Sequence, residues 1–342
     1  MFVGHATLAF ALAVAVAERR GWSTTDALAV GVVAGAFATL PDVDVVYAVA
    51  TVDVARFLGG GTVHPSAFWA ATRDVHRSIT HSVLVALVAG PAFGLWAAAG
   101  DRTRPSGTPV IGAVRRLGEA PGSLAALCLA GLLAVAVAAS GSVGGVVMGA
   151  FVLGGAGLAE LGRRRTRLSA RSLAIAATGG LLSHPWGDLV TGTPPQLLYP
   201  VDVGILDARI ALHSDPTIHL LGAFALELAA VWLGVLAVVS VMDRSLGAFY
   251  DRSAGVGAAY GAAPFVLVPP TLEVAYHFVF SILAVGGACA VLAWYRSPTA
   301  ARPANGRDGG LRDGISTVVI GLLGVTVALV GYATVYLLQT LL

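Results

Sequence analysis

The chain has 342 residues, of which 56% are hydrophobic and only 12% are charged, with a mean hydropathy of +0.81. A soluble domain carries about 25% charged residues, so this chain has too few solvated groups to coat a soluble globule of its size. The formal net charge of +2 gives no indication of nucleic acid binding, and no nucleic acid partner is expected.

The apolar residues come in long blocks, which is the pattern of helices that cross a bilayer. Gly and Ala are frequent in these blocks, and small residues let neighbouring transmembrane helices approach closely. The Gly-rich stretch 140–145 predicts a tight turn. We therefore expect an all-α, polytopic transmembrane bundle of about ten helices, at residues 3–17, 26–40, 79–99, 123–139, 143–161, 172–190, 218–242, 254–268, 274–295 and 314–340.

The arginines divide unevenly between the two sides of this predicted bundle. Seventeen lie in one alternate set of connections, which includes a flexible loop at 296–313, and the other set holds four, Arg56, Arg73, Arg77 and Arg209. Cytoplasmic loops of membrane proteins carry the excess of basic residues. The arginine-rich set is therefore predicted to be cytoplasmic, and both chain termini are predicted to face outward.

Four short stretches hold most of the polar residues that are unusual for a membrane helix. In the predicted topology they all fall on the outer face, where the first helix starts, the second ends, the third starts and the sixth ends. Ionisable groups at membrane depth are costly and are usually functional. The four stretches predict one shared site and contain His5, Pro41-Asp42-Val43-Asp44, His76 to Ser82, and His184 to Asp188.

The residue types in these stretches suit a divalent metal ion, because neutral imidazoles and carboxylates are the usual ligands of zinc and its neighbours. Asp42 and Asp44 are two positions apart at a helix end, so both can turn toward one ion. His184 and Asp188 are four positions apart and share one face of a helix. Arg77 is a candidate partner for an anionic substrate oxygen, because a guanidinium offers forked donors.

Each of these residues alone has a simpler structural explanation. A lone His near the membrane surface is usually an interfacial polar residue, and a lone Asp at a helix end is usually a cap. The hydroxyl groups of Thr80 and Ser82 are better suited to support metal ligands than to act as nucleophiles.

Taken in order, the four stretches resemble the YdjM-like family of LexA-binding, inner-membrane, metal-dependent hydrolases. That family opens with a His soon after the initiator Met, then has Pro-Asp-x-Asp, His-Arg-x-x-Thr-His-Ser, and His-x-x-x-Asp followed by a Trp/Tyr-Pro turn. The turn corresponds here to Leu198-Tyr199-Pro200-Val201-Asp202, and the resemblance covers about residues 1–205. The family is in turn distantly similar to zinc-dependent phospholipase C.

The resemblance implies a membrane-embedded metal-dependent hydrolase domain at residues 1–205 and additional transmembrane helices at 206–342, in the inner membrane. It implies one or more divalent ions, with zinc the expected metal. Asp44 is implied as a ligand or as a base, and with Arg77 it is a catalytic candidate. The implied metal ligands are His5, Asp42, His76, His81, His184 and Asp188. The LexA association has no visible counterpart in the sequence.

The region after residue 205 holds further candidates to complete the site. Glu273 and His277 are four positions apart at the expected outward start of the helix at 274–295. His213 and His219 lie at the expected outward start of the helix at 218–242.

Three functions remain open. The leading hypothesis is an enzyme that uses a metal-activated water on a phosphoester or lipid-linked substrate at the outer face of the bilayer. The alternative is a transporter, or a protein that handles metal ions or protons, although we find neither the internal repeats nor the midplane cluster that transporters usually have. The third is a catalytically inactive structural membrane protein.

Overall fold

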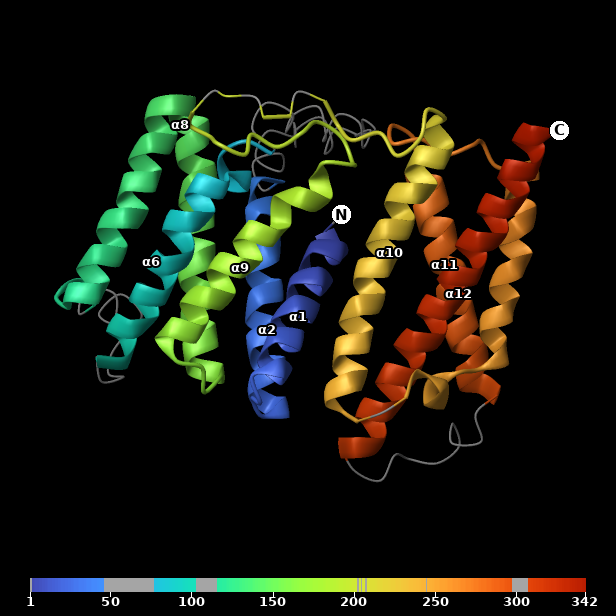
Figure 1. The fold of residues 1–342 in the computed structure, drawn as a ribbon, viewed down its shortest axis with the longest axis horizontal. Helices are drawn as coiled ribbons and strands as arrows, with labels where there is room; N and C mark the ends of the chain where they lie inside the picture. The colour runs from blue at the N-terminus through green and yellow to red at the C-terminus, as the bar shows by residue number, and fades with distance from the viewer. Residues whose placement is uncertain are drawn as a thin grey trace, which may run out of the picture. The chain divides into compact units, whose positions relative to one another are not determined.

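The computed structural model describes residues 2–45, 77–102, 116–201, 203, 205–206, 208–243, 245–296 and 307–342. These residues form helices, turns and loops (Figure 1). They divide into two compact units, Met1–Arg209 and Ile210–Leu342, called here the first and second unit. Each unit is described by itself.

In the first unit, long helices run up and down beside one another and short 3₁₀ turns occupy two of their ends (Figure 1). Ser23 begins one helix by accepting a hydrogen bond from the Asp26 backbone amide at 3.2 Å, which satisfies a donor left over by the helix ladder. The elements are α1 (Phe2–Arg19), α2 (Thr24–Thr39), η1 (Leu40–Asp44), η2 (Ile79–His81), α6 (Val83–Arg102), α8 (Ala120–Arg165) and α9 (Ala170–Asp188).

The long helix α8 is broken at Gly141, whose φ of 64° and ψ of −153° are not helical. Its two arms then pack closely, because a side chain at Gly144 would lie 2.6 Å from the Ala136 carbonyl oxygen. The break falls inside the Gly-rich stretch 140–145, and only a residue without a Cβ adopts this backbone conformation easily. α8 is therefore a helical hairpin, and its arms lie in the positions of two expected segments, 123–139 and 143–161.

Small residues let the helices of the first unit touch backbone to backbone. A Cβ at Gly180 of α9 would lie 2.3 Å from the Ala34 carbonyl oxygen of α2, and a Cβ at Gly90 of α6 would lie 2.2 Å from the Thr178 hydroxyl of α9. This close approach is typical of membrane helices, where packing replaces the hydrophobic effect. α9 is held between α2 and α6, and this contact positions the functional end of the unit.

The second unit is built around an aromatic core, with the Tyr332 and Phe278 rings 5.1 Å apart and the Tyr260 and Tyr332 rings 5.8 Å apart. Tyr332 and Phe278 are fully buried. The elements of the unit are α10 (Pro216–Val241), η3 (Leu246–Phe249), η4 (Arg252–Phe265), α11 (Tyr276–Arg296) and α12 (Arg307–Leu341).

The expectation of an all-helical membrane protein is confirmed, but the count of about ten spanning helices is not. In the described ranges, six helices are long and apolar enough to cross a bilayer, and α8 is counted once among them. The segment expected at 254–268 is the 3₁₀ helix η4, with Pro264 inside it. Its tighter winding, with about 3 residues per turn, and the missing amide of Pro264 separate it from the α-helices.

Candidate metal centre

The His and Asp residues of the four stretches converge at one end of the first unit. α1 starts there, α2 passes into η1 there, η2 leads into α6, and α9 ends. Four of the candidates, His5, His81, His184 and Asp188, are at most 4% exposed, and Asp44 is 1% exposed. Burial of so many ionisable groups is costly unless they are paired or bind a metal, so their arrangement needs a specific explanation.

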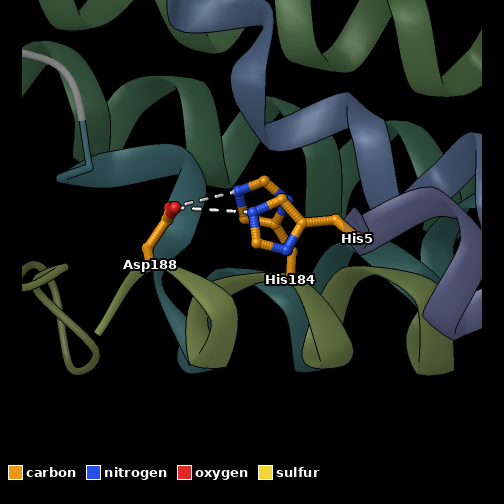
Figure 2. A group of neighbouring side chains, drawn as sticks. All are labelled: His5, His184 and Asp188. Carbon is orange, nitrogen blue, oxygen red and sulfur yellow. Dashed lines mark ion pairs between the residues drawn. The ribbon is translucent and has the colours of Figure 1, made fainter. Parts of the chain in front are cut away.

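The first half of the cluster consists of His5, His184 and Asp188, which come from the start of α1 and the end of α9 (Figure 2). His5 Nε2 lies 3.4 Å from Asp188 Oδ1, and His184 Nε2 lies 3.6 Å from Asp188 Oδ2. The two imidazole rings are 4.1 Å apart. The Nε2 atoms of His5 and His184 therefore both point at the Asp188 carboxylate, as Figure 2 shows.

The second half is formed by Asp42, His81 and His184. His81 Nε2 lies 3.8 Å from Asp42 Oδ1 and 3.3 Å from Asp188 Oδ2, and His184 Nε2 lies 3.6 Å from Asp42 Oδ1. His184 therefore belongs to both groups, and the Asp188 carboxylate faces all three histidines. The side chain of Asp42 is 10% exposed, more than any of the three histidines.

The spacing of these atoms fits coordination of an ion better than direct contact. Hydrogen bonds between nitrogen and oxygen measure about 2.7–3.2 Å, whereas the five imidazole–carboxylate separations around the shared space run from 3.3 to 3.8 Å. A tetrahedral zinc ion holds such ligands at about 2.0–2.1 Å, which places them about 3.3–3.4 Å from one another. His5 Nε2, His184 Nε2 and Asp188 Oδ2 are buried and make no hydrogen bond within the described part of the chain. The donor set therefore fits a divalent metal.

A surrounding layer of hydrogen bonds fixes how the imidazoles face. His184 Nδ1 lies 2.7 Å from the Ala38 carbonyl oxygen of α2, and a carbonyl can only accept, so this nitrogen carries the proton and Nε2 keeps its lone pair. Behind His81, the Nδ1 atom lies 3.6 Å from Asp44 Oδ2 and 3.1 Å from the Thr80 hydroxyl. Partners of this kind orient metal-binding histidines in proteins.

Arg77 is a clamp between the end of α9 and the segment before η2. Its φ of 66° is in the left-handed region, and its backbone amide donates to Asp44 Oδ2 at 3.2 Å. The guanidinium NH2 lies 3.1 Å from Asp188 Oδ1, and NH1 donates to the carbonyl oxygens of Asp188 at 3.2 Å and Thr193 at 3.0 Å. These donors face protein groups, so the side chain positions Asp188.

Two local features allow the helix ends to meet, and sequence reasoning did not anticipate either. A Cβ at Gly187 would lie 2.5 Å from His5 Cε1, so only glycine leaves room for the His5 ring. The Ser82 hydroxyl caps α6 by accepting from the Leu84 amide at 3.2 Å, and it also donates to the Tyr199 carbonyl oxygen at 2.8 Å. The spacing of His184 and Asp188 is kept because α9 continues through Pro185 to Asp188.

The other candidates are placed differently. His76 lies outside the described residues. Within the described part of the chain, groups of three potential metal ligands occur only in the first unit, whereas His213, His219, Glu273 and His277 belong to the second. The expected helical pair of Glu273 and His277 is wrong, since α11 begins at Tyr276, after a turn in which the Val274 amide donates to the Thr271 carbonyl oxygen.

The three histidines of the second unit contact backbone groups. Nδ1 of His219 accepts from the Leu212 amide at 3.0 Å, and Nδ1 of His213 accepts from the Asp215 amide at 3.0 Å. Nε2 of His277 lies 2.9 Å from the Val268 carbonyl oxygen. These contacts support local turns and helix starts.

The sequence model of the family described as "YdjM inner membrane protein" matches residues 1–254. The chain belongs to the YdjM inner membrane protein family. The match includes each residue of the cluster and extends beyond residue 205, so the YdjM resemblance is longer than expected and takes in α10. No curated protein and no solved structure matches the chain. Membership of this family and the six apolar helices together identify an integral protein of the inner membrane.

Proposed function

We propose that the chain is a membrane-bound, metal-dependent hydrolase that acts on a phosphoester or lipid-linked substrate. One observation carries the proposal: buried imidazole nitrogens and carboxylate oxygens from α1, η1, η2 and α9 face a common space at separations of 3.3–3.8 Å. The shorter of these separations match those of ligands around a zinc ion, and the two overlapping groups fit one or more ions. His5, Asp42, His81, His184 and Asp188 would hold the metal, with zinc the expected ion.

When bound, such an ion supplies a water of lowered pKa and polarises the substrate oxygen. The residues of the chain have separate tasks in this proposal. Asp44 and Thr80 hold the His81 ring, the Ala38 carbonyl holds His184, and Arg77 holds Asp188. The family resemblance implied Asp44 as a metal ligand or a base. Its position behind His81 favours instead a role in orienting the His81 ring.

Asp42 lies on the side of the cluster that is most open to solvent. Its side chain is 10% exposed, whereas the side chains of Asp44 and Asp188 are 0% and 3% exposed. Asp42 is therefore the most solvent-accessible of the proposed metal ligands. In this proposal Arg77 reaches the substrate only through the Asp188 carboxylate that it positions.

The distribution of arginines supports a site on the non-cytoplasmic face of the membrane, because the cytoplasmic side carries the excess of basic residues. The bond between the headgroup and the apolar part of a lipid lies near the membrane surface, which is also where helix ends lie. A cluster at helix ends suits such a substrate better than it suits a transport path, which needs polar groups near the midplane.

The test is hydrolysis of a panel of phospholipids by the zinc-loaded protein in lipid nanodiscs, followed as release of the water-soluble headgroup. We expect turnover by the wild-type protein and by His277→Ala, a matched control in the second unit. Turnover should stop on chelation and in Asp42→Asn. Turnover that survives both changes would contradict the proposal, and so would bound zinc without turnover of any lipid in the panel.

A further inference from the structure

An apolar groove runs along the first unit between α1, α2 and α9, with a volume of about 250 Å³. Its walls carry aliphatic side chains such as Leu12, Val16 and Ile175, which are 54%, 46% and 56% exposed. Small residues, including Ala13 and Gly179, also line the groove. The groove is therefore an open channel for an apolar group and lies on the surface of the unit.

Each wall of the groove continues into the metal-binding cluster one helical turn further on. On α1, the lining residue Ala9 is four positions from His5. On α2, the lining residue Ala34 is four positions from Ala38, whose carbonyl oxygen faces His184 Nδ1. Residues four apart share one face of a helix.

The α9 wall leads to the same place. Ser183 lines the groove next to His184 in sequence, and it is four positions from Gly187, the residue against which the His5 ring packs. One turn is about 5.4 Å, so all three walls bring the groove to within about a turn of the cluster. The opposite end is bounded by Arg20 and Trp22, residue types that anchor a protein at the membrane surface.

From these observations we infer that the groove holds one acyl chain of the lipid substrate while the phosphoester headgroup lies at the metal-binding cluster. This inference rests on the proposed function and names its substrate class, a phospholipid. From Ala9 to Arg20 the groove spans about 16 Å at about 1.5 Å per residue. Half of a bilayer core of about 30 Å is close to that length, so the groove is about as long as one acyl chain.

Charge is distributed to match such a lipid. The groove itself is lined by apolar side chains over most of its length, while the end where the headgroup would lie carries histidines, Arg77 and the carboxylates of Asp42, Asp44 and Asp188. The apolar chain fits the groove, and the anionic phosphodiester fits the polar end once a divalent ion offsets the charge of the carboxylates. A helix of another copy would fill the groove but would bring no phosphodiester to the cluster.

The inference is tested by photolabelling the full chain in nanodiscs with phosphatidylglycerol that carries a diazirine on one acyl chain. We expect labels to concentrate on residues 9–17 and 172–183. The exposed α8 side chains Leu127 and Leu153, 71% and 76% exposed, provide the reference for general bilayer contact. Labelling of the groove no stronger than labelling of this α8 face would overturn the inference.

A matched pair of glycine variants sharpens the test. A Cβ at Gly179 meets no atom within 4 Å, and the same is true of Gly131 on α8, so both glycines should accept leucine without a change of fold. Gly179→Leu should reduce groove labelling about tenfold, the loss expected when about two methylene groups of the chain are displaced. Gly131→Leu should leave it unchanged, and Ala13→Leu fills the groove from the opposite wall. Equal labelling in all three variants would contradict the inference.

Zinc content measured on the same samples separates this inference from the proposed function. Zinc without selective groove labelling would overturn the inference and leave the hydrolase intact. Selective labelling of the groove in protein that contains no zinc would support a lipid-binding site and contradict the proposed hydrolase function. Chelation should weaken labelling by phosphatidylglycerol because its phosphodiester loses an anchor. Labelling that chelation leaves unchanged would show a bound lipid that is not the substrate.

Discussion

Two polar clusters stand at opposite ends of α6 in the first unit, and they are built in opposite ways. At the far end, Glu160 takes direct hydrogen bonds from Arg116 NH2 at 2.6 Å and from Arg163 Nε and NH2 at 3.0 and 2.9 Å, and Arg164 also contacts it. The Arg116 guanidinium stacks over the Trp96 ring at 5.0 Å. Both oxygens of this carboxylate meet donors at contact distance.

At the near end, the histidines and carboxylates stay 3.3–3.8 Å apart. An imidazole and a carboxylate could close to about 2.7–3.2 Å if they bonded directly, as the guanidinium groups and the Glu160 carboxylate do. The Glu160 carboxylate is therefore paired directly with guanidinium groups on both oxygens, whereas the histidines and carboxylates of the other cluster surround a space of their own. In the proposed function, a divalent ion would occupy that space.

The largest expected effect comes from Asp188→Asn, because this carboxylate faces His5, His81 and His184. We expect the zinc affinity to fall by more than about 100-fold, beyond the range that loss of an orienting partner produces. Competition with a coloured chelator measures it. Asp215→Asn, which changes a helix cap in the second unit, is the control. An equal loss of zinc affinity in both variants would show that the zinc site does not lie in the first unit.

Asp44→Asn should have a smaller effect, because Asp44 acts on the ion through His81. Loss of such a partner lowers metal affinity by about 10–100-fold. The same competition assay measures the change. If Asp44→Asn abolished binding as completely as Asp188→Asn, Asp44 would have to be a ligand itself.

Gly187→Ala tests the approach of α1 to α9. The added Cβ would lie 2.5 Å from His5 Cε1, so the ring must move and zinc affinity should fall by about tenfold, the lower end of the range for disturbed ligand orientation. Gly179→Ala on the same helix, where a Cβ meets no atom within 4 Å, is the matched control. Unchanged affinity in Gly187→Ala would mean that His5 is not a ligand.

Glu160→Gln should leave zinc binding unchanged, since the carboxylate lies in the other cluster. It should lower the free energy of unfolding by about 1–3 kcal/mol, less than a fully buried ion pair because the Glu160 side chain is partly exposed. Thermal unfolding in detergent measures the change. A loss of zinc in this variant would show that the two clusters are coupled and would contradict the claim that zinc binding depends on the His/Asp cluster alone.

Much of this arrangement is readable in the sequence. The apolar blocks predicted the helices, Gly141 falls in the stretch predicted to turn, and the His and Asp residues at helix ends were expected to lie together. Family membership follows from the same motifs. Those patterns are readable because helix periodicity and motif order are local properties of the chain.

Other features carry no such pattern. The Ala38 carbonyl that faces His184 belongs to the backbone, so the residue type at position 38 could not predict this contact. The contacts of Arg77 with Asp188 and its neighbours are a result of tertiary packing, and its contact with a substrate oxygen stays a prediction. The 3₁₀ geometry of η4 was missed because its composition resembles that of a membrane helix.

The most direct test of the metal centre is elemental analysis of the detergent-purified wild-type chain beside a double His81→Ala/His184→Ala variant, each after reconstitution with divalent ions. The account predicts one or more equivalents of zinc or a related metal in the wild type and none in the variant. No metal in either sample, or equal metal in both, would contradict it, and the cluster would then be a buried hydrogen-bond network.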